Sequence, residues 1–189
     1  MASQEANSSM EQLAQSLAPP EIIVDGEIIL RQYNVKDVHQ VYELVDNNRD
    51  HLSEFLGWAK FYTEDEALVD AKEALKQIEL AKQASYEIIF NGEIVGAVNL
   101  YGREGECSEM GYWLAEAAQG KGILTRSAGA LLKFGFEQWG LREVLLDINP
   151  ANHKSLALLR RLGAKPISKP DVVSGVMKPV MTQTWSITR

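Results

Sequence analysis

The sequence has a single cysteine, and it lacks both a long apolar run and a basic N-terminal region. Cys107 alone cannot build an internal disulfide framework or a cysteine-based zinc site, and it is typical of a reducing compartment. No run of about 18 apolar residues occurs, so no transmembrane helix is expected. Met1–Pro20 has no basic region followed by an apolar core, so it does not resemble a secretory signal. We therefore expect a cytoplasmic location and no membrane partner.

Positive charge is also scarce. The chain has 19 Lys and Arg residues against 26 Asp and Glu residues, which gives a net charge of −7. Binding to nucleic acid requires clustered Lys and Arg, so no nucleic-acid partner is expected. The negative charge is compatible with a cationic substrate such as an amine, a lysine side chain or a protein N-terminus. Solubility alone also accounts for it.

The length of 189 residues suffices for one ordinary domain and leaves little room for a second. We expect a flexible segment over residues 1–20 and a single domain over residues 21–189. Hairpin signals at Asp25-Gly26 and Asn91-Gly92 come first, and a β-α-β-α-β series follows them. This order favours an α+β fold with a mixed sheet over a doubly wound parallel sheet.

The local signals predict these elements. Thr63 with Glu66 three residues later forms a capping box, and Gly140 is placed to end a long apolar helix. Helices are expected at Val35–Val45, His51–Leu56, from Thr63 to about Gln83, at Ile123–Trp139 and at Asn152–Leu162, with a short one from Ser8 to Leu17. Strands are expected at Glu21–Val24, Glu27–Tyr33, Tyr86–Phe90, Glu93–Leu100, Glu106–Leu114, Glu143–Ile148, Ala164–Ser168 and Lys178–Thr188.

The most informative stretch is the loop Gln119-Gly120-Lys121-Gly122, which joins an expected strand to an expected helix. Such a turn suits a phosphate group, because glycine lets the main chain approach an anion closely and the first helical turn has free N–H groups. Ile123 follows Gly122, so the Gly-Lys-Ser/Thr ending of a Walker loop is missing, as is the third glycine of a dinucleotide fingerprint. Taken alone, the pattern also fits a plain tight turn.

Three motifs together resemble the GNAT acetyltransferases, in particular the branch that acetylates the N-terminal amine of ribosomal proteins. The resemblance extends from about Glu21 to Thr188, and it implies a mostly antiparallel, twisted central sheet flanked by helices, with a splay between two central parallel strands. The motifs are Glu109-Met110-Gly111-Tyr112-Trp113-Leu114, then Gln119-Gly120-Lys121-Gly122-Ile123-Leu124-Thr125, then Asn149, Asn152 and Ser155 with Arg161-Leu162-Gly163.

The resemblance implies acetyl coenzyme A (acetyl-CoA) as the donor, an amine as the acceptor and no metal ion. The pyrophosphate would lie on the main-chain amides of the glycine loop, and the pantetheine arm would pair with the preceding strand like an added strand. Asn152 would hydrogen-bond the pantetheine, and Ser155 would lie near the thioester sulfur. The residues implied in coenzyme binding are Trp113, Leu114, Gln119, Gly120, Lys121, Gly122, Ile123, Leu124, Thr125, Asn149 and Asn152.

The sequence departs from the family pattern at three positions. Ala117 stands where Gln or Arg often begins the loop, and Ala164 stands where Phe usually follows the last glycine. Leu159 occupies the position at which many members carry a tyrosine acid. The loss of that tyrosine moves the role of proton donor to Ser155.

The chemistry needs a neutral amine, a stabilised oxyanion and a proton for the leaving thiolate, because the amine attacks the thioester carbonyl directly. Glu109 is the candidate general base, either directly or through a water, and Ser155 is the candidate proton donor. The alternatives are a surface carboxylate at Glu109 and a helix-start residue at Ser155.

The acceptor is not specified by the sequence. It can be a protein N-terminus of the ribosomal type or a small-molecule amine such as an antibiotic. Two other classes remain open: an inactive module that binds or senses coenzyme A, and a structural protein whose glycine turn binds nothing. Edge strands near the C-terminus permit a monomer or a homodimer.

Overall fold

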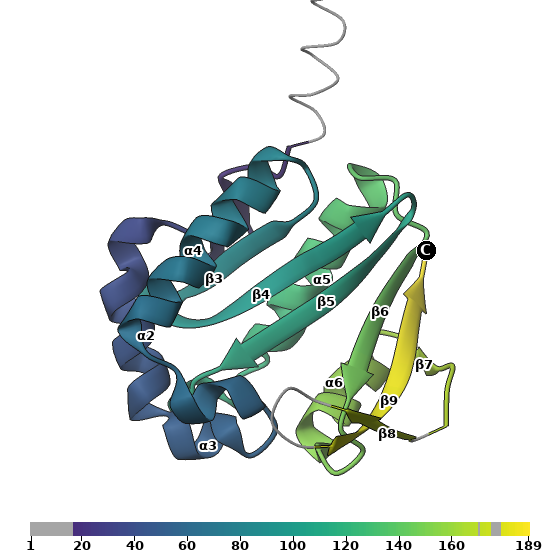
Figure 1. Cartoon of the computed structure of the whole chain (residues 1–189). Coiled ribbons are helices and arrows are strands. Elements are labelled where there is room, and N and C mark those ends of the chain that lie inside the picture. The colour runs from purple at the N-terminus through teal and green to yellow at the C-terminus, as the bar shows by residue number, and fades with distance from the viewer. Residues whose placement is uncertain (1–16, 170, 175–178) are drawn as a thin grey trace, which may run out of the picture.

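The structure is a computed structural model that describes residues 17–169, 171–174 and 179–189 (Figure 1). The predicted helix from Ser8 to Leu17 and most of the predicted flexible segment lie outside these residues. In chain order the elements are β1 (Glu21–Ile23), β2 (Ile28–Gln32), η1 (Val35–Asp37), α2 (Val38–Asn47), α3 (Arg49–Ser53), η2 (Gly57–Phe61), α4 (Glu64–Glu79), β3 (Ala84–Phe90), β4 (Glu93–Glu104), β5 (Cys107–Leu114), η3 (Glu116–Ala118), α5 (Ile123–Glu137), β6 (Glu143–Ile148), α6 (His153–Arg161), β7 (Lys165–Pro166), β8 (Asp171–Ser174) and β9 (Pro179–Thr188), where η marks a 3₁₀ helix.

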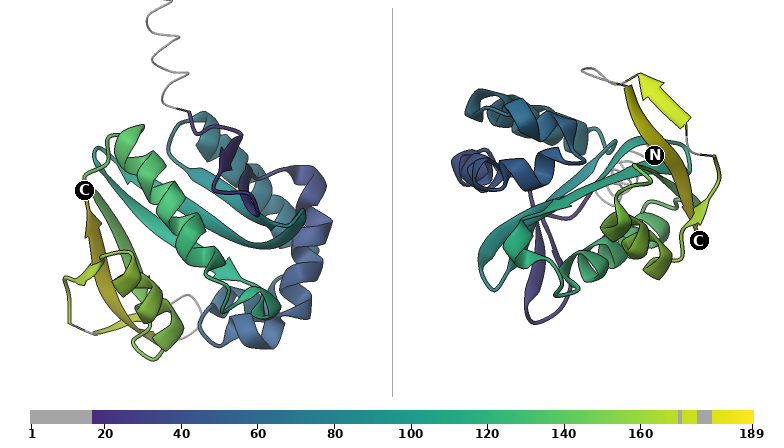
Figure 2. Two further views of the ribbon diagram at one scale, coloured as in Figure 1. Left: turned by 180° about the vertical axis from the view of Figure 1, so that it is seen from behind. Right: turned by 90° about the horizontal axis from the view of Figure 1, so that it is seen from below.

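The strands form one sheet in the order β1-β2-β3-β4-β5-β6-β9-β7, and β8 pairs with β9. Among the described strands the β5–β6 pair is parallel and the other pairs are antiparallel. Helices α2 and α4 cover one face of the sheet, and α5 and α6 cover the other (Figure 2). The predicted α+β fold with a mixed sheet is confirmed.

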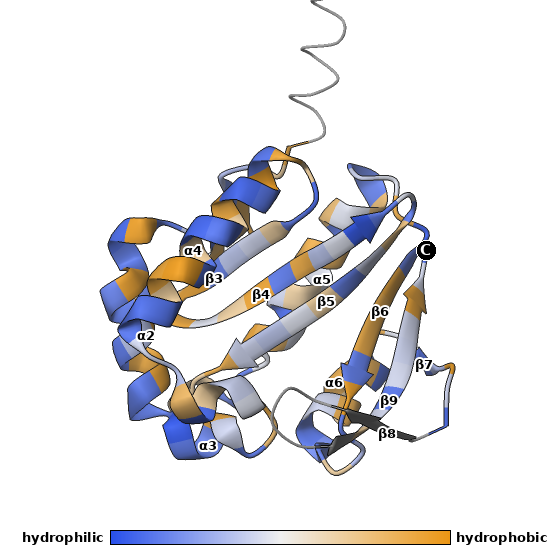
Figure 3. Cartoon of the chain, in the orientation of Figure 1, coloured by the Kyte–Doolittle hydropathy of each residue, from blue (hydrophilic) through white to orange (hydrophobic). Residues whose placement is uncertain are grey.

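Helix α4 shows how the sequence sets its own start. The Thr63 side chain accepts a hydrogen bond from the Glu66 amide, and the Glu66 carboxylate accepts one from the Thr63 amide at 2.8 Å, so the predicted capping box is confirmed. Its buried side recurs at helical spacing, which gives α4 the two-sided hydropathy visible in Figure 3. The prediction that this helix reaches Gln83 is wrong. It ends at Glu79, because Ala81 has a φ of +53° and the chain turns there into β3.

Two other predicted helices are corrected in their bounds. The helix expected at Val35–Val45 begins as the 3₁₀ turn η1 and continues as α2 to Asn47, with Asn34 accepting a hydrogen bond from the Lys36 amide. The helix expected at His51–Leu56 lies earlier, at Arg49–Ser53. The sequence signals therefore located these helices but not their ends.

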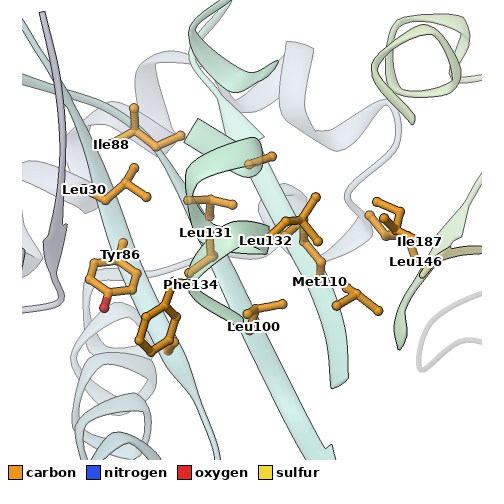
Figure 4. Close-up of a cluster of buried hydrophobic side chains, with 14 of the residues drawn as sticks. Leu30, Tyr86, Ile88, Leu100, Met110, Leu131, Leu132, Phe134, Leu146 and Ile187 are labelled. Atoms are coloured by element: carbon orange, nitrogen blue, oxygen red, sulfur yellow. The ribbon is translucent and has the colours of Figure 1, made fainter. Parts of the chain in front are cut away.

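The main core lies between α5 and the sheet. Leu131, Leu132 and Phe134 of α5 lie among buried side chains of the sheet strands (Figure 4). Burial of one such side chain contributes roughly 1.5–3 kcal/mol. Packing is close at Gly135, where a Cβ atom would lie 2.9 Å from Cδ1 of Leu100. Helix α5 is therefore a fixed support for the loop that precedes it.

The C-terminal strands differ from the prediction. The strand expected at Ala164–Ser168 is only two residues long, Lys165–Pro166, and β8 was not predicted. The expected strand Lys178–Thr188 is present as β9 from Pro179, and Lys178 itself lies outside the described residues. As predicted, β9 pairs with the short strand β7, but it also pairs with the whole of β6. β6 therefore keeps a strand partner on its β9 side along its whole length.

A carboxylate is buried under the helices on the α2–α4 face. The Glu87 side chain on β3 is 3% exposed, and its Oε2 accepts a hydrogen bond at 2.9 Å from Nη2 of Arg31, which also contacts Asp37 at 3.0 Å. Burial raises the pKa of Glu87 from its ordinary 4.5 to about 7, and Arg31 offsets this only in part. At neutral pH the folded protein therefore holds an unfavourable charge at this position.

The free energy of unfolding should fall as the pH rises from about 4.5 to about 7, and Glu87→Gln should remove that fall. Below about pH 4.5 the carboxyl is protonated in both states, and above about pH 7 it is ionised in both, so the loss accumulates between these values. The wild type should lose roughly 3 kcal/mol more than the variant across this window, since one pKa unit corresponds to about 1.4 kcal/mol. Calorimetric melting at several pH values measures the difference. If stability depends on pH in the same way in both proteins, Glu87 does not ionise in its buried position. Glu93→Gln, at an exposed position, is the control and should follow the wild type.

Candidate active site

The two central strands separate after three paired positions. The parallel pairs are Cys107 with Glu143, Ser108 with Val144 and Glu109 with Leu145, although β5 continues to Leu114 and β6 to Ile148. Beyond Glu109, β5 stays paired with β4, and β6 stays paired with β9. The facing edges of β5 and β6 are therefore left without a strand partner over their last residues, which is the splay visible in Figure 1. The splay that the resemblance implied is confirmed.

The register decides which residues of β5 face this opening. The Ala115 amide donates to the Val95 carbonyl on β4 at 2.8 Å. Because hydrogen-bonding direction alternates along an antiparallel strand, the main chain of Trp113 also faces β4, while that of Tyr112 and Leu114 faces the splay. A Cβ atom on Gly96 would collide with the Trp113 carbonyl oxygen, which agrees with this direction. The expectation that Trp113 offers its main chain to the pantetheine is therefore corrected in favour of Tyr112, and Leu114 is retained.

The glycine loop has the backbone that the sequence suggested. Gly120 and Gly122 have φ angles of +76° and +71°, and a Cβ atom on either would meet no atom within 4 Å. Gly122 occupies the N-cap position of α5 and provides no side-chain cap. Within the described residues, no acceptor contacts the amides from Gly120 to Thr125. These uncapped amides and the positive end of the helix dipole form a suitable cradle for an anion.

Gln119 does not fit the predicted role. Its amide already donates to the Glu116 carbonyl at 3.0 Å, so it cannot serve an anion as the other loop amides can. Its side chain instead forms a bridge, donating from Nε2 to Nε2 of His51 at 2.6 Å and accepting from Nζ of Lys154 at 2.7 Å. Gln119 thereby ties α3 and α6 to the loop from opposite sides.

Positive charge near the loop comes from a residue that sequence reasoning did not assign. Nε of Arg161, at the end of α6, donates to the Thr125 hydroxyl at 3.3 Å. Arg126 is already paired with Asp25 at 2.7 Å and with Glu27 at 2.9 Å, and the Lys121 ammonium lies 5.7 Å from the centre of the Phe90 ring. The sequence marked Arg161 as part of a family motif, but only the packing of α6 places it beside the loop.

The start of α6 supplies the next group of predicted residues. Oδ1 of Asn152 accepts a hydrogen bond from the Ser155 amide at 3.0 Å, so Asn152 is the N-cap and its amide NH₂ group remains available. Asn149 shapes the turn before the helix, since its Oδ1 accepts from the Ala151 amide at 2.9 Å. The Ser155 side chain is a neighbour of the Tyr112 phenol, whose pKa is raised by burial and lowered in part by this neighbour. The buried phenol oxygen has no hydrogen-bond partner among the described residues. Tyr112 thus joins the site through both its main chain and its hydroxyl.

Glu109 lies at the vertex of the splay, in the last pair that joins β5 to β6. Its side chain is exposed, and it neighbours Tyr101 of β4. The pKa of the Tyr101 phenol is raised by burial first and then by the charges of Glu109 and Asp147. A carboxylate at this vertex is accessible to solvent and can accept a proton from an approaching amine.

The described residues contain no candidate metal-binding site. No group of three or more His, Cys, Asp or Glu residues in this part of the chain is placed to hold a metal ion. In the same residues, no helix combines the length and apolar character needed to cross a membrane.

A splayed parallel pair that leads into an uncapped, glycine-rich helix start characterises acetyltransferases that hold a coenzyme A thioester in the splay. The family profile described as "Acetyltransferase (GNAT) domain" matches residues 27–165. The chain therefore belongs to the GNAT family and is an N-acetyltransferase that uses acetyl-CoA.

Named relatives agree with this assignment. The ribosomal-protein-serine acetyltransferase of Escherichia coli (strain K12) is 26% identical over 132 residues, which cover 67% of this chain and 72% of the relative. Among solved structures, the ribosomal L7/L12 alpha-N-protein acetyltransferase RimL in complex with coenzyme A has a TM-score of 0.84 at 20% identity, covering 89% of this chain and 97% of that chain. The microcin C7 self-immunity acetyltransferase MccE, in complex with acetyl-CoA and AMP, has a TM-score of 0.81 at 22% identity, covering 92% of this chain and 99% of that chain.

Proposed function

We propose that this protein transfers the acetyl group of acetyl-CoA to the primary amine of a protein N-terminus of the ribosomal type. The observation that carries the proposal is the open splay, which runs from Glu109 at its vertex to the uncapped amides of the glycine loop. The names of two similar proteins, a ribosomal-protein-serine acetyltransferase and a ribosomal L7/L12 alpha-N-protein acetyltransferase, support an N-terminal amine as the acceptor.

The residues fit a pyrophosphate followed by an extended pantetheine arm. The loop amides from Gly120 to Thr125 would hold the pyrophosphate, since both glycines leave open space where a Cβ atom would stand. The main chain of Tyr112 and Leu114 would pair with the amides of the pantetheine, and the NH₂ group of Asn152 would donate to one of its carbonyls. The arm would thus occupy the place of the missing strand between β5 and β6.

The chemical step is direct attack in a ternary complex. Glu109 accepts the proton that the ammonium of the acceptor must lose, directly or through a water, and the neutral nitrogen then attacks the acetyl carbonyl. The new C–N bond forms, the C–S bond breaks, and the leaving thiolate takes a proton from the Ser155 hydroxyl. The acylated nitrogen then loses its second proton, which restores the Ser155 hydroxyl directly or through a water. The Tyr112 phenol is a neighbour of that hydroxyl. No covalent enzyme intermediate is needed.

A screen of amines, measuring free thiol released from acetyl-CoA, tests the acceptor class. Peptides with a free N-terminus should give rapid release, N-terminally blocked peptides should give none, and small amines such as aminoglycosides should react slowly. Added chelator should leave the rate unchanged. Faster release with small amines than with any peptide would overturn the proposed acceptor, and the absence of release with every amine would favour a coenzyme-binding module without activity.

A further inference from the structure

A cavity lies on the α2–α4 face of the sheet, lined by residues of both helices and of β3 and β5. It measures about 50 Å³, well above the room that one water needs, and Glu87 and Trp113 are among the sheet residues that line it. Trp58 and Asp70 also line it and are exposed to solvent, while Glu87 is buried. The cavity therefore connects an acidic interior to an acidic, aromatic opening.

The charge around this cavity is negative. Asp70 and Glu87 line the cavity, and Glu87 shares its partner Arg31 with Asp37. A second guanidinium, that of Arg49, donates to the carbonyl of the lining residue Tyr62 and is itself paired with Asp46. Among the described residues, Glu87 accepts a hydrogen bond from Arg31 through Oε2 alone, so its Oε1 has no protein donor. Although Asp70 is open to solvent, partial desolvation raises its pKa, the Tyr62 side chain opposes that rise, and the charge of Glu66 adds to it. A bound cation would relieve the cost of ionising both cavity carboxylates.

The walls suit a cation as well. The rings of Trp58 and Tyr62 pack edge to face with centroids 5.0 Å apart, and Trp113 and Tyr33 complete an aromatic lining. Aromatic faces attract ammonium and guanidinium groups, most strongly where water is excluded. Two carboxylates among aromatic rings therefore select a positively charged group rather than an anion or a neutral apolar one.

The sheet register fixes how this cavity relates to the catalytic position. Arg31, Glu87, Ala97 and Trp113 are direct cross-strand neighbours on β2, β3, β4 and β5. Glu109 lies four positions before Trp113 on β5, so both side chains are on the same face, about 13 Å apart along the strand. A group in the cavity and an amine at Glu109 can thus belong to one extended molecule, separated by a few residues of peptide.

We infer that the cavity lined by Glu87, Asp70, Trp58 and Trp113 binds a guanidinium or ammonium side chain of the acceptor, and thereby selects N-termini that carry a basic residue near the amine to be acetylated. This inference rests on the proposed function, because it assumes that the acceptor is a peptide. It adds a specificity site that is separate from the coenzyme cradle.

Matched peptides test the inference. Arginine or Nε-dimethyllysine is placed at position 2, 3, 4 or 5 of a peptide with a free N-terminal serine, and each is compared with citrulline or norleucine at the same position. None of these side chains can itself be acetylated. At one position at least, the cationic peptide should have a KM about tenfold lower than its neutral partner. Glu87→Gln and Asp70→Asn should each remove most of this preference while leaving turnover of the neutral peptide and coenzyme A affinity unchanged.

Controls separate the possible outcomes. Glu79→Gln removes one charge from an exposed position at the end of α4, outside the cavity, and should retain the preference. Calorimetric titration of an N-terminally acetylated, unreactive cationic peptide into the coenzyme A complex gives a readout independent of turnover. Equal KM values for cationic and neutral peptides at every position would overturn the inference. A cation preference that persists in Asp70→Asn would also overturn it, and this test remains valid if Glu87→Gln does not fold. Absence of turnover with all peptides, together with unaltered cation binding, would instead count against the proposed reaction.

Discussion

Gly120→Val is expected to weaken coenzyme A binding by about 10- to 100-fold. A valine in the left-handed conformation of Gly120 costs roughly 1–2 kcal/mol, and its side chain would project into the open space where the pyrophosphate is proposed to lie. The remaining loss comes from amides that can no longer approach the anion closely. Calorimetric titration of coenzyme A into the variant measures the change.

The chain contains a matched control for this experiment. Gly105, in the turn between β4 and β5, has a φ of +59°, and a Cβ atom at this position would likewise meet no atom within 4 Å. Gly105→Val therefore introduces similar backbone strain outside the cradle. It should lose similar thermal stability but keep its affinity for coenzyme A. Equal affinity in Gly120→Val and the wild type would refute the cradle.

Glu109→Gln is expected to lower turnover by about 100-fold, because a general base contributes roughly 10²- to 10⁴-fold to such a step. The amide cannot accept the proton of the ammonium, so the residual rate should rise with pH as more acceptor becomes neutral in solution. Coenzyme A affinity should change little, since Glu109 lies at the vertex of the splay and the cradle lies beyond its open end. Steady-state kinetics across the pH range provide the measurement.

An exposed carboxylate outside the splay provides the control for Glu109→Gln. Glu93 is exposed on β4 near the hairpin turn, and Glu93→Gln should behave as the wild type. Wild-type turnover in Glu109→Gln at every pH would remove Glu109 from the mechanism. If the wild type itself releases no thiol with any amine, the protein is a coenzyme A sensor rather than a working enzyme.

Local sequence patterns predicted what depends on neighbours along the chain. Thr63 and Glu66 predicted a capped helix, and the two glycines of the loop predicted a main chain with positive φ angles at the start of α5. Such features arise from interactions within a few residues, so a single sequence contains their cause. The helix end predicted at Gln83 was wrong, because Ala81 adopts a positive φ that no local signal in the sequence marked.

Register and distant contacts could not be predicted in this way. Trp113 and Tyr112 are adjacent in sequence, and only the pairing of β5 with β4 decides that the main chain of Tyr112 faces the splay. The contact of Arg161 with Thr125 and the bridge from His51 through Gln119 likewise join different helices to the loop. No periodicity along the chain signals these contacts.

The sequence by itself determined the α+β class, the glycine-rich start of α5 and the family to which the motifs point, because these depend on local conformation and residue type. The tertiary structure alone decided where β5 and β6 part, since β9 pairs with β6 along its whole length while β4 holds β5. It also gathered Glu87, Asp70 and Trp113, from three separate elements, around one cavity. Main-chain pairing between distant strands sets both sites, and its geometry is fixed only when the sheet is assembled.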